Sequence, residues 1–338
     1  MWLSSLHHRL VPVDHSSQVG RIRRDAMGMA RDIGLKAEDV ERAGIVATEI
    51  ATNISKFGGP DGTVLLRCDI PASAIELIGL DRGPGIVDPE RLFVDRTSTV
   101  GTLGTGLGAI HRLSDSFALH TAEGVGTVLF ARIQARRPPP YSAPPSCMVA
   151  AVCVAAGELP ECGDGWFVRQ DDGRTELLVV DALGHGPAAA LVVDRCRETL
   201  TETAPSGPEA VLRGLHAALP GTRCTVAMAV QITDGTLWSS GVGNISGRLF
   251  SDGAPHRLLS HPGILGQGIP NIRLTSTPFP PGSLLVLHSD GLSQKWQMDD
   301  YPGLEHCHPA VIAGVLFRDH VNRQDDCTVL VARAPAMP

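Results

Sequence analysis

The chain has 338 residues, of which 43% are hydrophobic and 19% are charged, and its formal net charge is −7. This mild acidity and the lack of a Lys/Arg cluster argue against nucleic acid as the main partner. No apolar run approaches the roughly 20 residues that span a bilayer, and no signal peptide is visible. The eight cysteines occur singly, without metal-binding spacing. We therefore expect a reduced, cytoplasmic protein of two domains, without a membrane partner.

A proline-rich run divides the sequence. Residues 136–146 read RRPPPYSAPPS, which favours neither a helix interior nor a central strand. We predict one domain over 1–135, an extended linker over 136–146 and a second domain over 147–338.

The first domain begins with two predicted helices, over 17–33 and 37–57, because apolar residues recur there at helical spacing. Glu49, Asn53 and Lys56 in the second helix are spaced i, i+4 and i+7, so they form one row. Taken alone, such a row is more often a solvated face than a binding site. Strands are predicted next, over 63–69 and 73–80.

Two glycine-containing stretches follow. In DRGPGI, Gly83 and Gly85 flank a proline, and Asp81 at the mouth of this tight loop can accept a hydrogen bond from a base amino group. Residues 101–108 read GTLGTGLG and open a predicted helix that continues through residue 114. Glycine lets backbone amides approach phosphates, and a helix N-terminus favours negative charge. The three motifs, in this order, indicate a nucleotide site.

The stretches VATEIATNISKFG, DRGPGI and GTLGTGLGAIHRLSD resemble the N, G1 and G2 boxes of GHKL-type ATPases, above all the RsbT-like serine/threonine switch kinases. The resemblance covers about residues 10–133 and implies an α/β sandwich with ATP between helices and sheet. It implies that Glu49 orients or deprotonates the attacking hydroxyl, that Asn53 holds Mg²⁺ against the phosphates and that Asp81 reads adenine. The other predicted ATP-binding residues are Lys56, Gly83, Gly85, Gly104, Gly106 and Gly108.

In the second domain, acids recur at strand ends. Asp181 and Asp290 follow apolar strands, and Asp164 and Asp325 lie beside strand starts. Alone, Asp181 is as well explained as the cap of a helix predicted at about 187–203. Four such acids in one domain indicate an all-oxygen site, which suits Mg²⁺ or Mn²⁺ better than zinc.

The stretches GELPECGDGW, VVDALGHGPAAA, GVGN, LHSDGL and DDCTVLVA resemble SpoIIE/RsbX-type PPM protein phosphatases, relatives of the type-2C enzymes, over about 148–334. The resemblance implies an αββα sandwich with a binuclear Mn²⁺/Mg²⁺ centre that hydrolyses phosphoserine or phosphothreonine. It implies that Asp181 bridges the two ions and is catalytic, and that Asp164 lies beside the second ion. The further implied ligands are the Ala182 carbonyl, Asp290 and Asp325.

Two assignments stay open at this point. The family pattern favours Asp325 over the adjacent Asp326 as a ligand, but the spacing does not separate them. His185 and His288 are either acids of the reaction or hydrogen-bonded structural residues, and the structural interpretation is favoured.

These observations predict an α+β protein in which a GHKL-type sandwich precedes a PPM-type sandwich. The favoured function is a bifunctional regulator of a bacterial partner-switching pathway, with ATP, Mg²⁺ and Mn²⁺ as cofactors. Its first domain would phosphorylate a STAS-domain anti-anti-sigma-type protein or a stressosome-like component, and its second would remove such a phosphate. In the alternative, the first domain is a non-catalytic nucleotide-binding or anti-sigma-like module that regulates the phosphatase.

Overall fold

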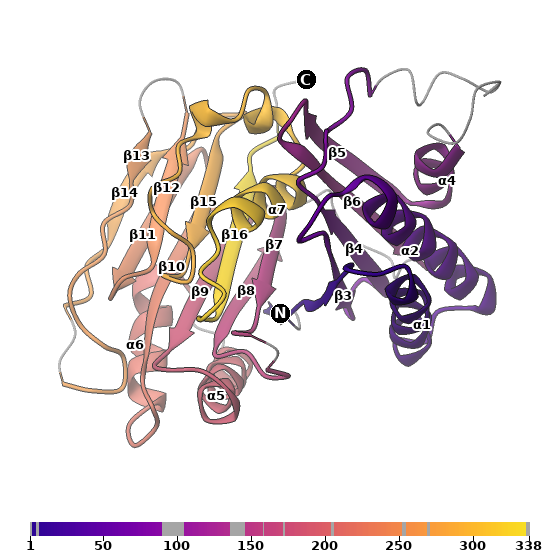
Figure 1. Cartoon of the computed structure of the whole chain (residues 1–338). Coiled ribbons are helices and arrows are strands. Elements are labelled where there is room, and N and C mark those ends of the chain that lie inside the picture. Colours follow the sequence, from indigo (N-terminus) through magenta and orange to yellow (C-terminus); the bar gives the residue numbers. More distant parts are fainter. Residues whose placement is uncertain are drawn as a thin grey trace. The chain divides into compact units, whose positions relative to one another are not determined.

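The computed structural model of the chain describes residues 2–4, 7–89, 105–135, 146–157, 159–171, 173–203, 206–251, 255–268 and 271–335. The chain divides into two compact units (Figure 1). The first unit consists of His8–Tyr141 and Pro302–Arg318, and the second of Met1–His7, Ser142–Tyr301 and Asp319–Pro338. Apart from Ser146, the predicted linker lies outside the described residues, so the predicted domain boundaries stay a prediction.

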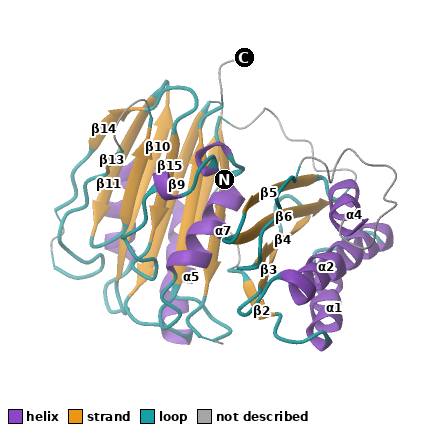
Figure 2. Cartoon of the chain, turned by 45° about the horizontal axis from the view of Figure 1, so that its top comes forward, coloured by secondary structure: helices purple, strands orange, loops and turns teal. Residues whose placement is uncertain are grey.

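The first unit is an antiparallel sheet with helices on one face (Figure 2). Its strands, in the order β2-β3-β4-β6-β5, are β2 (Arg9–Pro12), β3 (Thr63–Asp69), β4 (Ala74–Leu80), β5 (Ser116–Ala122) and β6 (Gly126–Gln134). The helices on this face are α1 (Ser17–Asp32), α2 (Ala37–Phe57) and α4 (Thr105–Leu113). The bounds of α2 and β3 agree with the prediction. Helix α2 was predictable because it buries a regular stripe that includes Val46, Ile50 and Ile54.

The opposite face of this sheet is covered by the segment 302–318. Helix α7 (Pro309–His320) lies against it so closely that a Cβ on Gly314 would be 2.9 Å from Val128 Cγ1 and 3.3 Å from Ile78 Cγ2. Just before α7, His308 stacks on Phe130 with ring centroids 4.7 Å apart. The sequence does not reveal α7 by periodicity, because residues 309–317 are all buried and leave no amphipathic stripe.

In the part of the second unit that the structure describes, two antiparallel sheets pack with α-helices. One sheet has the order β1 (Leu3–Ser4), β8 (Asp164–Asp171), β9 (Arg174–Ala182), β10 (Thr225–Thr233), β11 (Thr236–Val242) and β14 (Thr275–Pro278). The other has the order β13 (His256–Arg257), β12 (Ser246–Phe250), β15 (Leu284–His288), β16 (Cys327–Arg333) and β7 (Met148–Val154). The α-helices of this unit are α5 (Pro187–Thr203) and α6 (Pro208–Ala218), and a short 3₁₀ helix lies at Met298–Asp300. A second short 3₁₀ helix, at Leu304–His306, belongs to the first unit.

Strand β9 is buried on both faces. Leu177 and Val179 belong to a core that they share with side chains of β15, β16 and β7. Leu178 and Val180 point to the other face and pack in a core with α5 and α6. This double burial explains the unbroken apolar run before Asp181, and the two-unit α+β organisation confirms the predicted fold class.

None of the helices in the described ranges is long and apolar enough to cross a membrane.

Candidate functional sites

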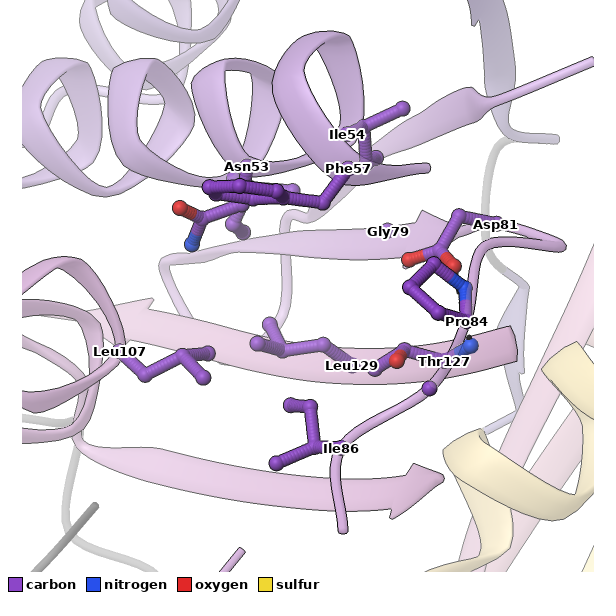
Figure 3. A pocket seen from close by; sticks show the side chains of 12 residues that line it. Asn53, Ile54, Phe57, Gly79, Asp81, Pro84, Ile86, Leu107, Thr127 and Leu129 are labelled. Carbon is purple, nitrogen blue, oxygen red and sulfur yellow. Dashed lines mark hydrogen bonds between the residues drawn. The ribbon is translucent and has the colours of Figure 1, made fainter. Parts of the chain in front are cut away.

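The first candidate site is a cavity of about 300 Å³ in the first unit (Figure 3). Its walls come from α2, α4, the sheet and the loop after β4, through Ile50, Asn53, Ile54, Phe57, Gly79, Asp81, Pro84, Gly85, Ile86, Leu107, Thr127 and Leu129. Most of these side chains are apolar, and the carboxylate of Asp81 and the amide of Asn53 lie toward opposite ends in Figure 3. An apolar slot with a few placed polar groups is typical of a small-molecule site and suits a flat base.

Asp81 is held in place by the backbone around it. Its Oδ1 accepts hydrogen bonds from the amides of Gly83 at 2.9 Å and Thr127 at 3.1 Å. Burial raises the pKa of Asp81, although these two amide bonds act in the opposite direction. With Oδ1 engaged in this way, Oδ2 is the oxygen suited to accept a hydrogen bond from the amino group of a bound base.

The two glycines of the predicted G1 loop are required by close backbone approaches. A Cβ at Gly83 would be 2.1 Å from the carbonyl oxygen of Phe57, and one at Gly85 would be 2.2 Å from that of Ala122. Gly85 also has a φ of +73°, a conformation that favours glycine. Gly85 lines the cavity, whereas Gly83 shapes the loop from outside the cavity wall.

At the other end of the cavity, α4 begins against α2. A Cβ on Gly106 would be 2.8 Å from Glu49 Oε2 and 3.3 Å from Asn53 Oδ1, so these three predicted residues lie together. The amides at the start of a helix and an asparagine side chain are groups that bind phosphate and its metal ion.

The remaining predicted ATP-binding residues are less well placed or lie outside the description. Lys56 is exposed, and neither it nor Gly108 lines the cavity. Gly104 lies outside the described residues. The roles assigned to all of these residues stay predictions.

The second candidate site is a cluster of acids in the second unit. Asp164 and Asp181 face each other directly in the register of β8 and β9. Asp290 follows β15, and Asp325 precedes its neighbour β16. Burial and the negative charges of Asp164, Asp290 and Asp325 raise the pKa of Asp181 to about 9. The structure thus brings together the four predicted carboxylates, and Ala182 follows Asp181 directly.

Asp164 is the most deeply buried of the four. Its Oδ2 accepts a hydrogen bond from Ser289 Oγ at 2.6 Å, while its Oδ1 has no hydrogen-bond partner in the described structure. Burial is the main reason that the pKa of Asp164 is raised. A buried oxygen without a partner costs free energy, and a hard divalent cation is a partner that it fits.

The carboxylates do not already form a closed ligand set. Within the described ranges, no three His, Cys, Asp or Glu side chains are arranged so that they could hold a metal ion. The donor chemistry nevertheless fits Mg²⁺ or Mn²⁺, because buried carboxylates that raise one another's pKa are relieved by a shared cation.

The structure distinguishes Asp325 from Asp326. Asp326 is 3% exposed, and its two oxygens accept hydrogen bonds from the amides of Ala156 at 2.7 Å and Gly163 at 2.8 Å. Asp325 is half-buried, and burial and the charge of Asp290 raise its pKa. Asp326 therefore holds the backbone, and Asp325 remains the better candidate for a ligand. This clamp was not predicted, since nothing in the pair DD shows which acid points inward.

A histidine and an asparagine complete the surroundings of Asp290. His288 is fully buried, its Nδ1 donates to the carbonyl of Ser289 at 2.8 Å, and burial lowers its pKa to about 4. It is therefore neutral at pH 7, which agrees with the favoured structural interpretation, while His185 is exposed. Asn244, not predicted as a site residue, donates from Nδ2 to Asp290 Oδ2 at 2.7 Å. The GVGN motif was the available signal for it.

Two family models match different parts of the chain. A family model described as "Histidine kinase-like ATPase domain" matches residues 12–133, and one described as "Stage II sporulation protein E (SpoIIE)" matches residues 171–335. The serine/threonine-protein kinase RsbT of Bacillus subtilis (strain 168) is 32% identical over 106 residues, which are 31% of this chain and 80% of that protein.

Solved structures also resemble the chain. One, described as "The bacterial stressosome: a modular system that has been adapted to control secondary messenger signaling", is 26% identical with a TM-score of 0.52. It covers 55% of this chain and 99% of its own. Another, described as "Crystal structure of RsbX in complex with magnesium in space group P1", is 21% identical with a TM-score of 0.48, over 57% of this chain and 98% of its own.

One polypeptide therefore matches two different family models. The chain belongs to the RsbT-like family of histidine kinase-like ATPase domains, and its residues 171–335 are similar to the SpoIIE family.

Proposed function

We propose that the chain is a bifunctional regulator of a partner-switching pathway. Its RsbT-like domain transfers phosphate from ATP to a serine or threonine, and its SpoIIE-type domain removes phosphate from phosphoserine or phosphothreonine. The observation that carries this proposal is that both sites hold the expected groups, with Glu49 and Asn53 beside the start of α4 and three further acids around Asp181.

The proposed kinase site works mainly by positioning. Asp81 selects the base, Asn53 holds Mg²⁺ against the phosphates, and the amides at the start of α4 face the transferred group. Glu49 lies beside Gly106, where it can orient or accept a proton from the attacking hydroxyl. Phosphoryl transfer depends on a metal ion, amide donors and alignment rather than on covalent chemistry, so this small set of groups is sufficient.

In the proposed phosphatase site, the four acids lie at strand ends, and a phosphoprotein would bind at these ends. Mn²⁺ or Mg²⁺ bound there would polarise the phosphoryl oxygens and supply the nucleophile for hydrolysis. Asp181 would bridge two ions, the Ala182 carbonyl, Asp290 and Asp325 would complete one ligand set, and Asp164 would bind beside the second ion. Asn244 orients Asp290 through the hydrogen bond to Oδ2.

The proposed substrate is a STAS-domain anti-anti-sigma-type protein or a stressosome-like component. The support for it is similarity: RsbT is named a serine/threonine kinase, and a similar solved structure is described as part of work on the bacterial stressosome. Opposed activities in one chain would set a level of phosphorylation rather than drive it to completion.

A second candidate function keeps the phosphatase and makes the first unit a non-catalytic nucleotide-binding module. The exposure of Lys56, away from the cavity, is compatible with that alternative.

The two candidates differ in phosphate transfer. The full chain is incubated with a purified STAS-domain protein and Mg-ATP, and then with Mn²⁺, while phosphate on the partner is followed by mass spectrometry. The bifunctional proposal expects phosphate to appear and then to disappear. Glu49→Ala and Asn53→Ala should abolish its appearance without affecting Mn²⁺-dependent hydrolysis of p-nitrophenyl phosphate, which is measured separately. If the wild type transfers no phosphate but still hydrolyses p-nitrophenyl phosphate, the first unit is a binding module.

A further inference from the structure

One arginine of α2 holds the last residue of α4. Nε and Nη2 of Arg42 donate to the backbone carbonyl of Leu113, at 3.1 and 2.8 Å. The carbonyls in the last turn of a helix lack partners within the helix, and a cation is favoured beside them. Arg42 therefore supplies, from a neighbouring helix, the group that the end of α4 needs.

The guanidinium of Arg42 is itself fixed by two carboxylates. Nη1 donates to Asp39 Oδ1 at 2.8 Å, and Nη2 donates to Asp115 Oδ2, also at 2.8 Å. The same Oδ2 accepts a hydrogen bond from the amide of Gln134, the last residue of β6, at 2.7 Å. The Arg42 side chain is 12% exposed, so little water competes for these bonds. The planar guanidinium can serve all of these acceptors at once, whereas a lysine presents its donors from a single atom.

Helix α4 runs along α2, from Arg42 to the proposed phosphate end of the cavity. Arg42, Glu49 and Asn53 are spaced i, i+7 and i+11, so they lie on one face of α2. The step from Arg42 to Asn53 spans roughly 16 Å, and the nine residues of α4 span roughly 13 Å. Leu113 lies at Arg42, whereas Gly106 lies beside Glu49 and Asn53. The two helices are therefore antiparallel, and one face of α2 contacts both ends of α4.

The apolar packing of α4 does not by itself set the position of the helix along this axis. Leu107 and Ile110 are buried in the core of the first unit. Apolar contact is non-directional, so it tolerates a shift of the helix along its axis. Hydrogen bonds weaken steeply when their geometry is disturbed, and Arg42 donates two of them to one carbonyl. Arg42 therefore fixes the end of α4, and with it the place of the amides at the start of the helix.

We propose that Arg42 is a positioning residue for phosphate transfer, which holds the amides at the start of α4 against the transferred phosphoryl group. This inference rests on the proposed function, because it takes the cavity as the site of an active kinase. During transfer, the γ-phosphorus bonds to the hydroxyl oxygen of a serine or threonine, its bond to ADP breaks, and the hydroxyl proton passes to Glu49, the proposed base. A misplacement of about 1 Å can cost about 100-fold in rate.

The base end of the cavity is held by other contacts. Asp81 lies toward the end opposite Asn53 (Figure 3). It is fixed there by the amides of Gly83 and Thr127. Loss of Arg42 should therefore impair the step that needs α4 and leave recognition of the base intact. This split between rate and binding separates positioning from a general loss of structure.

The test measures binding and transfer separately in the full chain. Calorimetry gives the Kd of ADP with Mg²⁺. The rate at which a purified STAS-domain protein increases ADP formation from Mg-ATP gives kcat and the KM for ATP, and it reports transfer even if the second unit later removes the phosphate. In Arg42→Gln, we expect kcat to fall at least about 10-fold and the Kd of ADP to change less than about 2-fold. Arg42→Lys, which keeps the charge but not the fork of donors, should recover only part of the rate.

A matched control is Arg23→Gln. Arg23 Nη2 pairs with Glu41 Oε2 at 3.2 Å, so the same substitution there breaks an ion pair between α1 and α2, a helix pair that does not include α4. Its kcat and its Kd for ADP should equal those of the wild type. If Arg42→Gln does not fold, Asp115→Ala removes the carboxylate that orients Nη2 of Arg42. That variant should show a smaller loss of kcat, with ADP binding kept.

The outcomes separate the two proposals. A wild-type kcat in Arg42→Gln, or in Asp115→Ala where that variant is used, overturns the role of Arg42 and leaves the proposed kinase intact. A loss of ADP binding in step with the loss of kcat means that Arg42 only supports the fold, and it overturns the inference as well. A wild type that forms no ADP in response to the STAS-domain protein defeats the proposed kinase and the positioning role together.

Discussion

Two carboxylates, one in each unit, lie in opposite surroundings, and Glu76 is buried whereas Asp181 is half-buried. Glu76 on β4 is 6% exposed and forms ion pairs with Arg67 and Arg132. Burial acts to raise the pKa of Glu76, but the two guanidinium groups outweigh it, so the pKa is lowered. Asp181 on β9 has other acids as its charged neighbours, and burial together with their charges raises its pKa to about 9.

The difference teaches how to separate structural from functional acids. A buried charge must be compensated, and the fold of the first unit supplies the compensation for Glu76 itself. Around Asp181 the described residues supply negative charge instead, which is costly unless a proton or a cation is present. The raised pKa and the unpartnered Oδ1 of Asp164 indicate a site that is completed by something from outside.

The largest expected effect follows from replacing Asp181, the acid whose neighbours are also acids. Asp181→Asn should reduce Mn²⁺-dependent hydrolysis of p-nitrophenyl phosphate about 10³-fold or more, since the loss of the proposed metal ligand would remove several kcal/mol of transition-state stabilisation. The rate is measured at saturating Mn²⁺ in the full chain.

The same variant tests whether the cluster is under repulsion. After treatment with EDTA, Asp181→Asn should be at least as stable to urea as the wild type, because a carboxyl group facing three acids has been replaced by a neutral amide. Added Mn²⁺ should stabilise the wild type by about 2.7 kcal/mol at 100 times its Kd, and the variant by much less. Equal stabilisation of both proteins would contradict a metal site at Asp181.

The complementary change replaces Glu76, the acid whose charge is compensated by Arg67 and Arg132. Glu76→Gln should lower the free energy of unfolding by about 3 kcal/mol, because Arg67 and Arg132 lose the buried charge that they share. Urea unfolding at pH 7 measures it, and hydrolysis at the acid cluster should not change.

The pH dependence of this stability has a definite sign. The folded pKa of Glu76 is lowered, so its contribution is present above the unfolded pKa of about 4.3 and is lost as the pH falls toward the folded pKa. The difference in stability between wild type and Glu76→Gln should therefore shrink below about pH 4. A difference that grows in acid would mean that the network does not hold Glu76 ionised.

Much of the fold could be predicted because local pattern and tertiary burial coincide. Helix α2 has a buried stripe of regular period, and β9 has an apolar run that ends at its acid. The pairing of β1 with β8 and the place of α7 could not be predicted in this way. They depend on contacts between residues far apart in sequence, and they leave no periodic signal.

The sequence named candidate site residues but not the contacts that organise them, and Lys56 and Gly108 do not line the cavity. Motif order brought Asp81, Asn53 and the four acids into consideration, and the structure places them in two clusters. The bonds that orient them were hidden, among them those from Thr127 to Asp81 and from Asn244 to Asp290. Such bonds join distant strands and loops, so only the folded chain reveals which polar residue supports which acid.

The smallest expected effect concerns two adjacent carboxylates, Asp325 and Asp326. Asp326 resembles Glu76 in being satisfied by the fold, through two backbone amides rather than two arginines. Asp325 resembles Asp181, because burial and a neighbouring acid raise its pKa. In Asp326→Asn, one of the two amides must face an NH₂ group, which should cost about 2 kcal/mol of stability without Mn²⁺.

Asp325→Asn should change that metal-free stability by less than about 0.5 kcal/mol, since the residue is half-buried and forms no comparable clamp. It should instead weaken the Mn²⁺ dependence of hydrolysis, which a titration of rate against Mn²⁺ measures. The two isosteric changes, one position apart, are each other's control. If Asp326→Asn weakened Mn²⁺ activation while Asp325→Asn destabilised the metal-free chain, the ligand and the clamp would have to be exchanged. The rule that an acid satisfied by the fold is structural would then fail at the site where it is most closely tested.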